Sequence, residues 1–552
     1  YAVSILLVPG SVGAIISSGS PEGTMTSLEA RSRQLTNGAD VRVRGAADDE
    51  FGSQPRPALF ERVSGVDAVT AVTSRSIGIG DSTAQLVALP SAAMPGVLTT
   101  VGGLVDTRAL AHALPAGGTS GVPLAAGAKS LSLTLTAITT PAPILDFGGN
   151  SLPAFTGPLG TVRGAIWLED GGGSLSRRLL SSVDLDTGGR DTPTRLALPA
   201  IGGTWSIVAV DLSLSARVDV EYTVSIASIA SGATAASESV ALDPTHNWVI
   251  QRRITPSVSQ FETVPLPAIG TSVLTHGNVD LRLMPALPGD DGTSFAAPPP
   301  LPVAVTRALA RHLDLAIGDN FDFAPRDSSF GVPAKVGAIT PVIPGTSADY
   351  AVLADLPRLN DYFLRGTAIP PQPNELWLRA DAPTAHSLRA IQRMAGPGSE
   401  VTVPTAPAAA SASQVALASL WLSSLGTVLL AVIAVLAVVI TLSRQRAAES
   451  AALSSVGQSA SAQARARLGE LLGVAVLAAG FGVLAGVVAA TLTAALLARS
   501  VVGASAALSA PVLVSALPAL LLLTIELLAI AAIGAVAAAR VRAIASSRGV
   551  GR

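Results

Sequence analysis

The stretch VALASLWLSSLGTVLLAVIAVLAVVITL, from Val415 to Leu442, is 28 residues long and contains no charged side chain. A helix needs about 20 consecutive apolar residues to cross the hydrocarbon core of a bilayer. Two further runs are long enough: 468–498, with Glu470 near its start, and 512–539, with the single charge of Glu526. Since buried helices of soluble domains rarely reach such lengths, the sequence predicts three membrane-spanning helices.

The arginines around these runs predict an orientation. The loop 443–467 carries four arginines against one acid, Glu449, and the tail 540–552 carries four arginines and no acid, whereas 499–511 has one arginine. Loops on the cytoplasmic side are enriched in Lys and Arg. The loop and the basic tail are therefore expected in the cytoplasm, and residues 20–410 outside it.

Composition limits the classes of function. The chain has 552 residues, and the part after residue 410 carries nine arginines and three acids, so it is basic, whereas residues 1–410 are acidic. The overall net charge of −2 argues against nucleic acid as the main partner. Cysteine is absent, which excludes disulfides, thiolate zinc sites and cysteine nucleophiles. Only two lysines occur and alanine is abundant, a bias typical of a high-GC bacterium, so a bacterial plasma membrane is expected.

The first residues, YAVSILLVPGSVGAII, are apolar but too short to span with certainty. No basic region precedes them, so a signal peptide is not supported. We interpret residues 1–18 as the outer end of a transmembrane helix that enters from the cytoplasm. The alternative is a buried helix of the outer domain.

Two features inside the predicted spans suggest how they pack. Gly482 and Gly486 form a G-x-x-x-G pair, which allows close helix approach, although glycine is common in membrane helices anyway. Glu526 lies near the middle of the last span, where a carboxylate is costly and is expected to face a partner helix. A functional role is the hypothesis for Glu526, with a packing contact or a subunit interface as the alternative.

The loop between the first two long runs reads RQRAAESAALSSVGQSASAQARAR, residues 444–467. Small and apolar residues recur in it at helical spacing, and Gly457 would end the helix that they predict. Arg446 and Glu449 are three residues apart and are expected to pair on its surface. The alternative is a positive connector that only sets topology.

Residues 444–473 resemble the cytoplasmic segment of the FtsX-like permease family, which includes the MacB-type and lipoprotein-exporting transporters. Ser454 stands where the family usually has Arg, and Ser450 where it has an apolar residue. The positions that match its pattern are Arg446, Glu449, Leu453, Val456, Gly457, Ser459 and Glu470.

This resemblance implies that the loop contacts a separate cytoplasmic ABC ATPase, which binds ATP and Mg, and that it transmits the motion of that ATPase to the spans. It also implies a second permease copy or half. The chain itself has no G-x-x-x-x-G-K-[ST] loop. A permease subunit without catalytic activity, metal or bound cofactor is therefore expected, acting on an extracytoplasmic substrate or a cell-wall enzyme.

The outer part is predicted as an α+β domain in two pieces, 20–114 and 263–403, followed by a Pro/Ala/Ser linker at 404–414. Strand and helix patterns alternate in both pieces. The fragment LPVAVTRALARHLDLAIGDNF, from Leu301 to Phe321, resembles actinobacterial members of the same family.

Between these pieces, residues 115–262 alternate apolar and polar residues and contain Gly, Pro and Asp turns, which predicts an inserted antiparallel β-sandwich. The piece GGTWSIVAVDLSLS, from Gly202 to Ser215, is similar to strands of galactose-binding-like jelly rolls. Trp167 and Trp205 are the candidate ligand residues, although a strand Trp is more often core. A membrane-anchored adhesion protein that binds cell wall or glycan is thus the alternative function.

No catalytic constellation is apparent. The five histidines are dispersed, without the spacing of a metal site. The stretch DLDTGGRD places Asp184, Asp186 and Asp191 in a Gly-rich turn, where calcium is an alternative to a plain turn.

Overall fold

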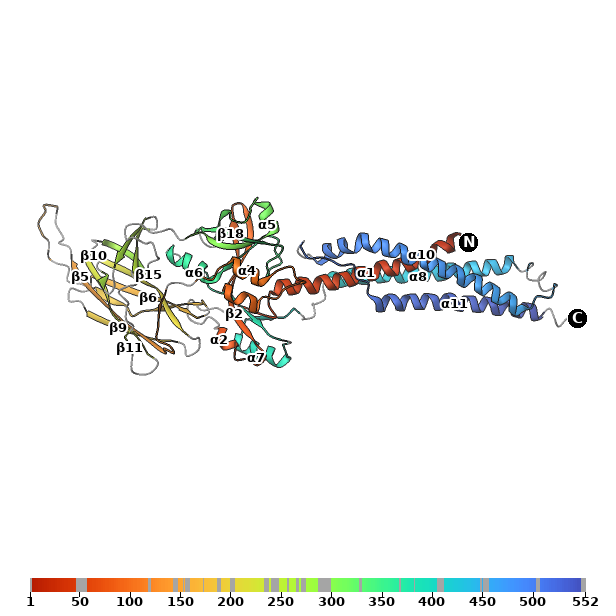
Figure 1. Ribbon diagram of the computed structural model, residues 1–552, viewed down its shortest axis with the longest axis horizontal. Helices are drawn as coiled ribbons and strands as arrows, with labels where there is room; N and C mark the ends of the chain where they lie inside the picture. The colour runs from red at the N-terminus through yellow and green to blue at the C-terminus, as the bar shows by residue number, and fades with distance from the viewer. Residues whose placement is uncertain are drawn as a thin grey trace. The chain divides into compact units, whose positions relative to one another are not determined.

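The computed structural model consists of two compact units, one formed by Tyr1–Arg33 with Thr405–Arg552 and the other by Gln34–Pro404 (Figure 1). It describes residues 2–547 except for 46–56, 118–120, 142–146, 152, 154–158, 172, 186–189, 199–203, 233–237, 240–247, 256–257, 265–267, 270–274, 286–298, 327–329, 367–368, 382, 405–411, 447–448, 450–455 and 503–506.

The first unit is a helix bundle built from the N-terminal part of α1 and from three long apolar helices. The helices are α1 (Ala2–Asn37), α8 (Ala412–Gln445), α10 (Ala460–Val502) and α11 (Ala516–Ser547). Three of them are long and apolar enough to cross a membrane, over Leu417–Gln445, Ser461–Ser500 and Ala516–Arg540. The three predicted spans are thus confirmed as helices of spanning length.

The surface of this bundle is apolar. Exposed leucines occur on α8, α10 and α11, among them Leu422, Leu429, Leu492, Leu496 and Leu528. Such an extended apolar surface is unfavourable in water and is typical of helices that contact lipid.

Helix α1 includes residues 2–18 of the predicted N-terminal helix and continues to Asn37. Inside the bundle it buries Val8, Val12 and Ile15. The helix ends where Gly38 adopts a positive φ of 74° and donates its N–H to the carbonyl of Gln34, 3.1 Å away. Glycine reaches this conformation without steric cost, so it is a common residue just after a helix.

The second unit contains a mixed sheet of nine described strands in the order β17-β18-β16-β19-β3-β2-β20-β1-β21. The pairs β16–β18 and β19–β3 are parallel, and the other pairs are antiparallel. The strands are β1 (Val41–Arg44), β2 (Ala68–Ile79), β3 (Ser82–Leu89), β16 (Leu301–Thr306), β17 (Asn320–Pro325), β18 (Val332–Thr340), β19 (Ala351–Asp355), β20 (Glu375–Arg379) and β21 (Glu400–Thr402). The helices and one 3-10 turn of this region are α2 (Pro57–Phe60), η1 (Ser91–Ala93), α3 (Met94–Val97), α4 (Thr107–Ala113), α5 (Arg307–His312), α6 (Leu356–Arg365) and α7 (Ala385–Ala395).

The same unit contains a second sheet of twelve described strands, all paired antiparallel. We call this part the β region. Its strands are β4 (Val122–Pro123), β5 (Ser130–Pro141), β6 (Gly160–Asp170), β7 (Leu175–Leu179), β8 (Val183–Leu185), β9 (Arg190–Ala197), β10 (Trp205–Gly232), β11 (Glu238–Ser239), β12 (Trp248–Thr255), β13 (Val258–Val264), β14 (Ala268–Ile269) and β15 (Thr275–Pro285). Residue 262, the predicted end of the insertion, lies inside β13, and the sheet continues to β15. The two-layer sandwich and the jelly-roll connectivity stay predictions.

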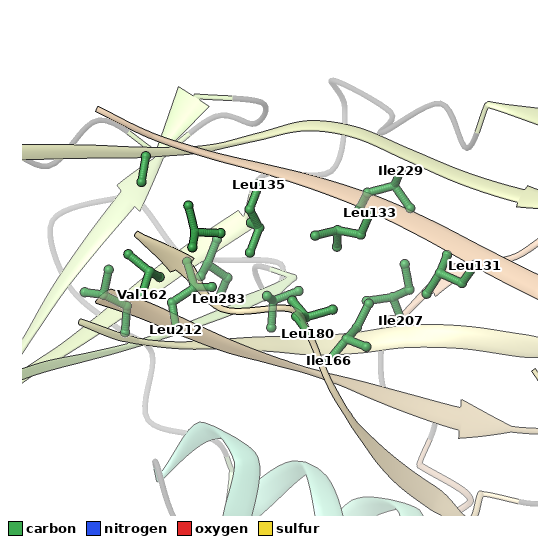
Figure 2. Packing of buried hydrophobic residues seen from close by; sticks show 14 of the residues in the cluster. Leu131, Leu133, Leu135, Val162, Ile166, Leu180, Ile207, Leu212, Ile229 and Leu283 are labelled. Carbon is green, nitrogen blue, oxygen red and sulfur yellow. The ribbon is translucent and has the colours of Figure 1, made fainter. Parts of the chain in front are cut away.

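One face of the β region is a hydrophobic core, and Figure 2 shows its side chains converging from several strands. On β6 the alternate residues Val162, Ile166 and Leu168 are buried in this core. Because successive strand residues point to opposite faces, Arg163 and Trp167 belong to the other face of the same strand.

Candidate functional site

The ends of α8 and α10 that flank the predicted coupling loop are joined by charged side chains. The Arg446 Nη1 atom lies 3.3 Å from a carboxylate oxygen of Glu470, and its Nε lies 3.9 Å from Glu449. Arg467 donates a 3.5 Å hydrogen bond to the main-chain carbonyl of Arg446. All of these groups are at least partly exposed, so the pairs orient the two helix ends and add little stability by themselves.

The structure places Val456, Gly457 and Ser459 in one exposed turn just before α10. The Val456 side chain is 86% exposed, and Gly457 has a φ of 90° with open space where a side chain would be. Ser459 is the residue before the helix, and its Oγ accepts a 3.3 Å hydrogen bond from the Ala462 N–H. Ser459 therefore caps α10, because its oxygen satisfies an N–H that has no partner within the helix.

Most of the predicted short helix lies outside the described residues, including Leu453, Ser450 and Ser454. The pair predicted between Arg446 and Glu449 is present at 3.9 Å. Glu470, predicted only as an element of the family pattern, is the second and nearer partner of Arg446.

A cavity of about 110 Å³ opens beside these charges, between α8, α10 and α11. Its wall is mainly aliphatic, with Val439, Ala475 and Ile530 among the lining residues, and Arg446 and Glu470 lie at its polar part. Such a space accepts an apolar group next to an ion pair. It is too small for the 300 Å³ or more that a drug-sized ligand usually needs.

Glu526 is buried in the bundle, with 1% of its surface exposed. One of its carboxyl oxygens is hydrogen-bonded to Ser11 of α1, and the Ser11 hydroxyl also lies 2.9 Å from the Val8 carbonyl. The other carboxyl oxygen has no hydrogen-bond partner among the described residues. The partner helix expected for Glu526 is thus α1, and the contact depends on a serine that the sequence analysis did not single out.

The predicted glycine pair also faces α1. A Cβ atom at Gly482 would lie 2.7 Å from the Pro9 carbonyl oxygen, and one at Gly486 would lie 2.9 Å from the Ile16 Cβ. On α1, a Cβ atom at Gly13 would lie 3.4 Å from the Gly482 oxygen. Three glycines therefore bring the two helix backbones close together, as small residues do in membrane helix pairs.

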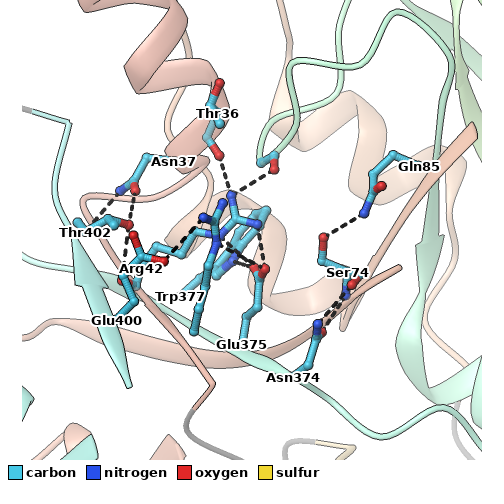
Figure 3. Close-up of polar contacts among 12 residues, drawn as sticks. Thr36, Asn37, Arg42, Ser74, Gln85, Asn374, Glu375, Trp377, Glu400 and Thr402 are labelled. Carbon is cyan, nitrogen blue, oxygen red and sulfur yellow. Dashed lines mark hydrogen bonds and ion pairs between the residues drawn. The ribbon is translucent and has the colours of Figure 1, made fainter. Parts of the chain in front are cut away.

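Within the second unit, a buried polar cluster holds the C-terminal end of α1 (Figure 3). Arg42 donates to both carboxylate oxygens of Glu375, at 2.7 and 2.6 Å, and it also donates to the carbonyl oxygens of Thr36 and Gly345. Trp377 donates its indole N–H to Glu375 over 2.8 Å. Burial lowers the pKa of the Arg42 guanidinium, and the hydrogen bond and charge of Glu375 oppose that shift.

The close packing of residue 345 against the Trp377 ring requires glycine at that position. Gly345 has a φ of 94°, and any side chain there would collide with the Trp377 ring, while its N–H donates over 2.7 Å to the Leu35 carbonyl. Arg42 and Glu375 stand on neighbouring antiparallel strands, β1 and β20. Sequence reasoning missed the cluster because Gly345 and Glu375 lie more than 300 positions from Arg42. The only local signal was a charged residue at the centre of the strand pattern VRVR.

Trp167 and Trp205, the candidate ligand residues, are buried, with 0% and 4% of their surfaces exposed. Neither presents an exposed ring face on which a sugar could stack, and their role as a ligand surface stays a prediction. Trp205 belongs to the core of the β region, and Trp167 donates its indole N–H to Asp211 over 2.8 Å. Their strands bury both rings because an indole removes a large apolar area from water.

The Asp-rich turn is only partly described. Asp191 is hydrogen-bonded to Thr136 of the neighbouring strand, whereas Asp186 lies outside the described residues. No group of three or more potential metal-ligating side chains occurs among the described residues.

No family model matches the sequence, and no curated protein matches it either.

Proposed function

We propose that this chain is the permease subunit of an ABC-type transporter, in which a separate cytoplasmic ATPase drives an extracytoplasmic domain through the membrane helices. The observation that carries the proposal is the exposed turn at Val456–Ser459. It joins two helices of spanning length, presents an apolar side chain and an unhindered glycine, and is bordered by the charges of Arg446 and Glu470.

A turn of this kind suits a partner groove. Valine supplies apolar area for burial, and the glycine lets another backbone approach closely. The turn leads directly into α10, and the Arg446–Glu470 pair links α10 to the end of α8, so a displacement of the turn would reach both helices. In this proposal the loop and the basic tail face the cytoplasm of a bacterium, and residues 34–404 act outside.

Helix α1 supplies a second route for such a displacement. Its N-terminal part packs against Gly482 and hydrogen-bonds to Glu526 in the bundle. Its last turn belongs to the other unit and is held there by Arg42 and Gly345. The mechanism needs no continuous channel, because force on a helix is enough to move the domain that holds its end.

The experiment reconstitutes the full chain in nanodiscs with each ABC ATPase candidate from the same genome and measures ATP hydrolysis. The chain is expected to change the hydrolysis rate, and Gly457→Trp is expected to abolish that change while insertion stays intact. Gly65→Trp is the matched control, because Gly65 is also an exposed turn glycine, with a φ of 83° and open space around it.

The proposal fails if no ATPase binds the full chain, or if Gly457→Trp and Gly65→Trp leave the hydrolysis rate equally unaffected. In that case the membrane-anchored binding protein becomes the better description.

A further inference from the structure

The outer face of the β region carries a cavity of about 370 Å³. Its floor is formed by β6, β7, β10 and β15, on the side of the sheet opposite the hydrophobic core. On this side of the sheet the strand register pairs Asp211 with Arg282, Ser213 with Asp280, and Trp167 with Arg177. Its volume is within the range of small-molecule sites.

Part of this charge is already used inside the protein. Asp211 accepts hydrogen bonds from Arg282 at 2.6 and 3.1 Å and from the Trp167 indole at 2.8 Å, so both of its oxygens are engaged. Arg282 also donates over 3.0 Å to the carbonyl of Leu364 at the end of α6. The guanidinium carbons of Arg177 and Arg282 lie 5.8 and 6.0 Å from the Trp167 ring centroid. This partly buried network fixes the floor and its charged groups in place.

Two groups at the cavity remain available. Arg163 is exposed and has no hydrogen-bond or ion-pair partner among the described residues. Asp280 is also exposed, and its Oδ1 accepts a 2.7 Å hydrogen bond from Ser213, which leaves its second oxygen as an acceptor. A ligand that satisfies both must accept hydrogen bonds from a guanidinium and donate one to a carboxylate.

The net charge of the cavity and its apolar lining residues indicate which class of ligand it can bind. Three arginines and two aspartates line the cavity, which leaves a surplus of one positive charge that favours an anion. Leu179 and Ile369 also line it, with 70% and 59% of their surfaces exposed, and they present apolar area to any occupant. A hydroxylated carboxylate with a C–H face has a negative charge for Arg163, a hydroxyl donor for Asp280 and apolar area for Leu179 and Ile369.

We propose that this cavity binds a sugar acid, with its carboxylate on Arg163, a hydroxyl on Asp280 and its C–H face against Leu179 and Ile369. This site does not depend on the transport proposal, because it requires no ATPase and no movement of the helices. In this proposal the β region binds a ligand, but the ligand does not contact the buried Trp167 or Trp205.

The test titrates D-glucuronate, D-glucose and propionate against the full chain in phosphatidylcholine nanodiscs, with binding followed by ligand-observed NMR. Saturable binding of glucuronate is expected, with glucose and propionate each at least about tenfold weaker, because each lacks one of the two charge-assisted hydrogen bonds. Equal binding of glucose or of propionate overturns the proposal, as does an absence of saturable glucuronate binding.

Three variants assign the contacts. Arg163→Gln is expected to weaken glucuronate binding about tenfold or more. Arg195→Gln is the matched control, since Arg195 is an exposed arginine of β9 that does not line the cavity, and it should bind as the unmodified chain does. Asp280→Asn should weaken glucuronate but not propionate. If Arg163→Gln and Arg195→Gln bind glucuronate equally, the proposed site is wrong.

Discussion

Arg42 of β1 and Glu375 of β20 are diagonal neighbours on adjacent strands and form two hydrogen bonds of 2.7 and 2.6 Å, although their side chains are only 2% and 5% exposed. Two charges buried this deeply stabilise each other, because removing either one would leave the other without its nearest ion-pair partner. Since Arg42 also binds the last turn of α1 through the Thr36 carbonyl, the pair decides how firmly that helix end is held.

Replacing Arg42 by Met should therefore destabilise the second unit by about 3–5 kcal/mol, the usual cost of breaking a buried ion pair by removing one partner. Thermal unfolding of the full chain, followed through tryptophan fluorescence, measures this. The control is Arg44→Met. Arg44 lies 3.5 Å from the same carboxylate but is 40% exposed, so its loss should cost less than about 1 kcal/mol. Equal effects of the two changes would contradict a special role for Arg42.

Gly482→Leu should separate α1 from α10, because its Cβ would lie 2.7 Å from the Pro9 carbonyl oxygen and backbone cannot give way as a side chain does. Gly480→Leu, two residues earlier on the same helix, meets no atom within 4 Å and should be tolerated. Pairs of engineered cysteines at the α1–α10 contact report the packing. Their disulfide yield should fall with Gly482→Leu only, and an unchanged yield would show that the contact is not tight.

The hydrogen bond between Ser11 and Glu526 should be visible as a coupling energy. Glu526→Gln keeps a hydrogen-bonding side chain of nearly the same size and should be tolerated, whereas Glu526→Ala should destabilise the bundle. In a double-mutant cycle with Ser11→Ala, we expect a coupling of about 0.6–2 kcal/mol, the range found for hydrogen bonds between membrane helices. Additive effects would mean that Glu526 is held by packing alone.

The proposed orientation can be tested directly because the chain has no native cysteine. With a single cysteine introduced at Ser459 or at Arg195, a membrane-impermeant maleimide should label intact cells only at position 195. Both positions are exposed in the folded chain, so access to the reagent rather than burial decides the result. Labelling at 459 with protection at 195 would reverse the orientation and remove the basis for an ATPase contact at the turn.

The sequence determined the elements whose signal is continuous along the chain. The three spans could be read from uninterrupted apolar runs, because a helix that contacts lipid needs apolar residues on all sides. The strands of the β region could also be predicted, because one face of each strand is buried and apolar residues therefore alternate with polar ones. The Gly482 and Gly486 pair and the burial cost of Glu526 were equally local signals.

The partners of these residues were decided only by the tertiary structure. Nothing near Glu526 in sequence pointed to Ser11, and nothing near Arg42 pointed to Glu375, because such pairs depend on which strands and helices become neighbours. For Trp167 and Trp205, the residue type alone suggested a role that the packing does not support. Their chemistry suits ligand stacking, but the packing of the β region buries both rings and leaves Arg163 and Asp280, two residues without any motif, at the surface of the cavity. A pattern along the chain fixes which face of an element is buried, whereas the identity of a contact depends on the packing of distant segments.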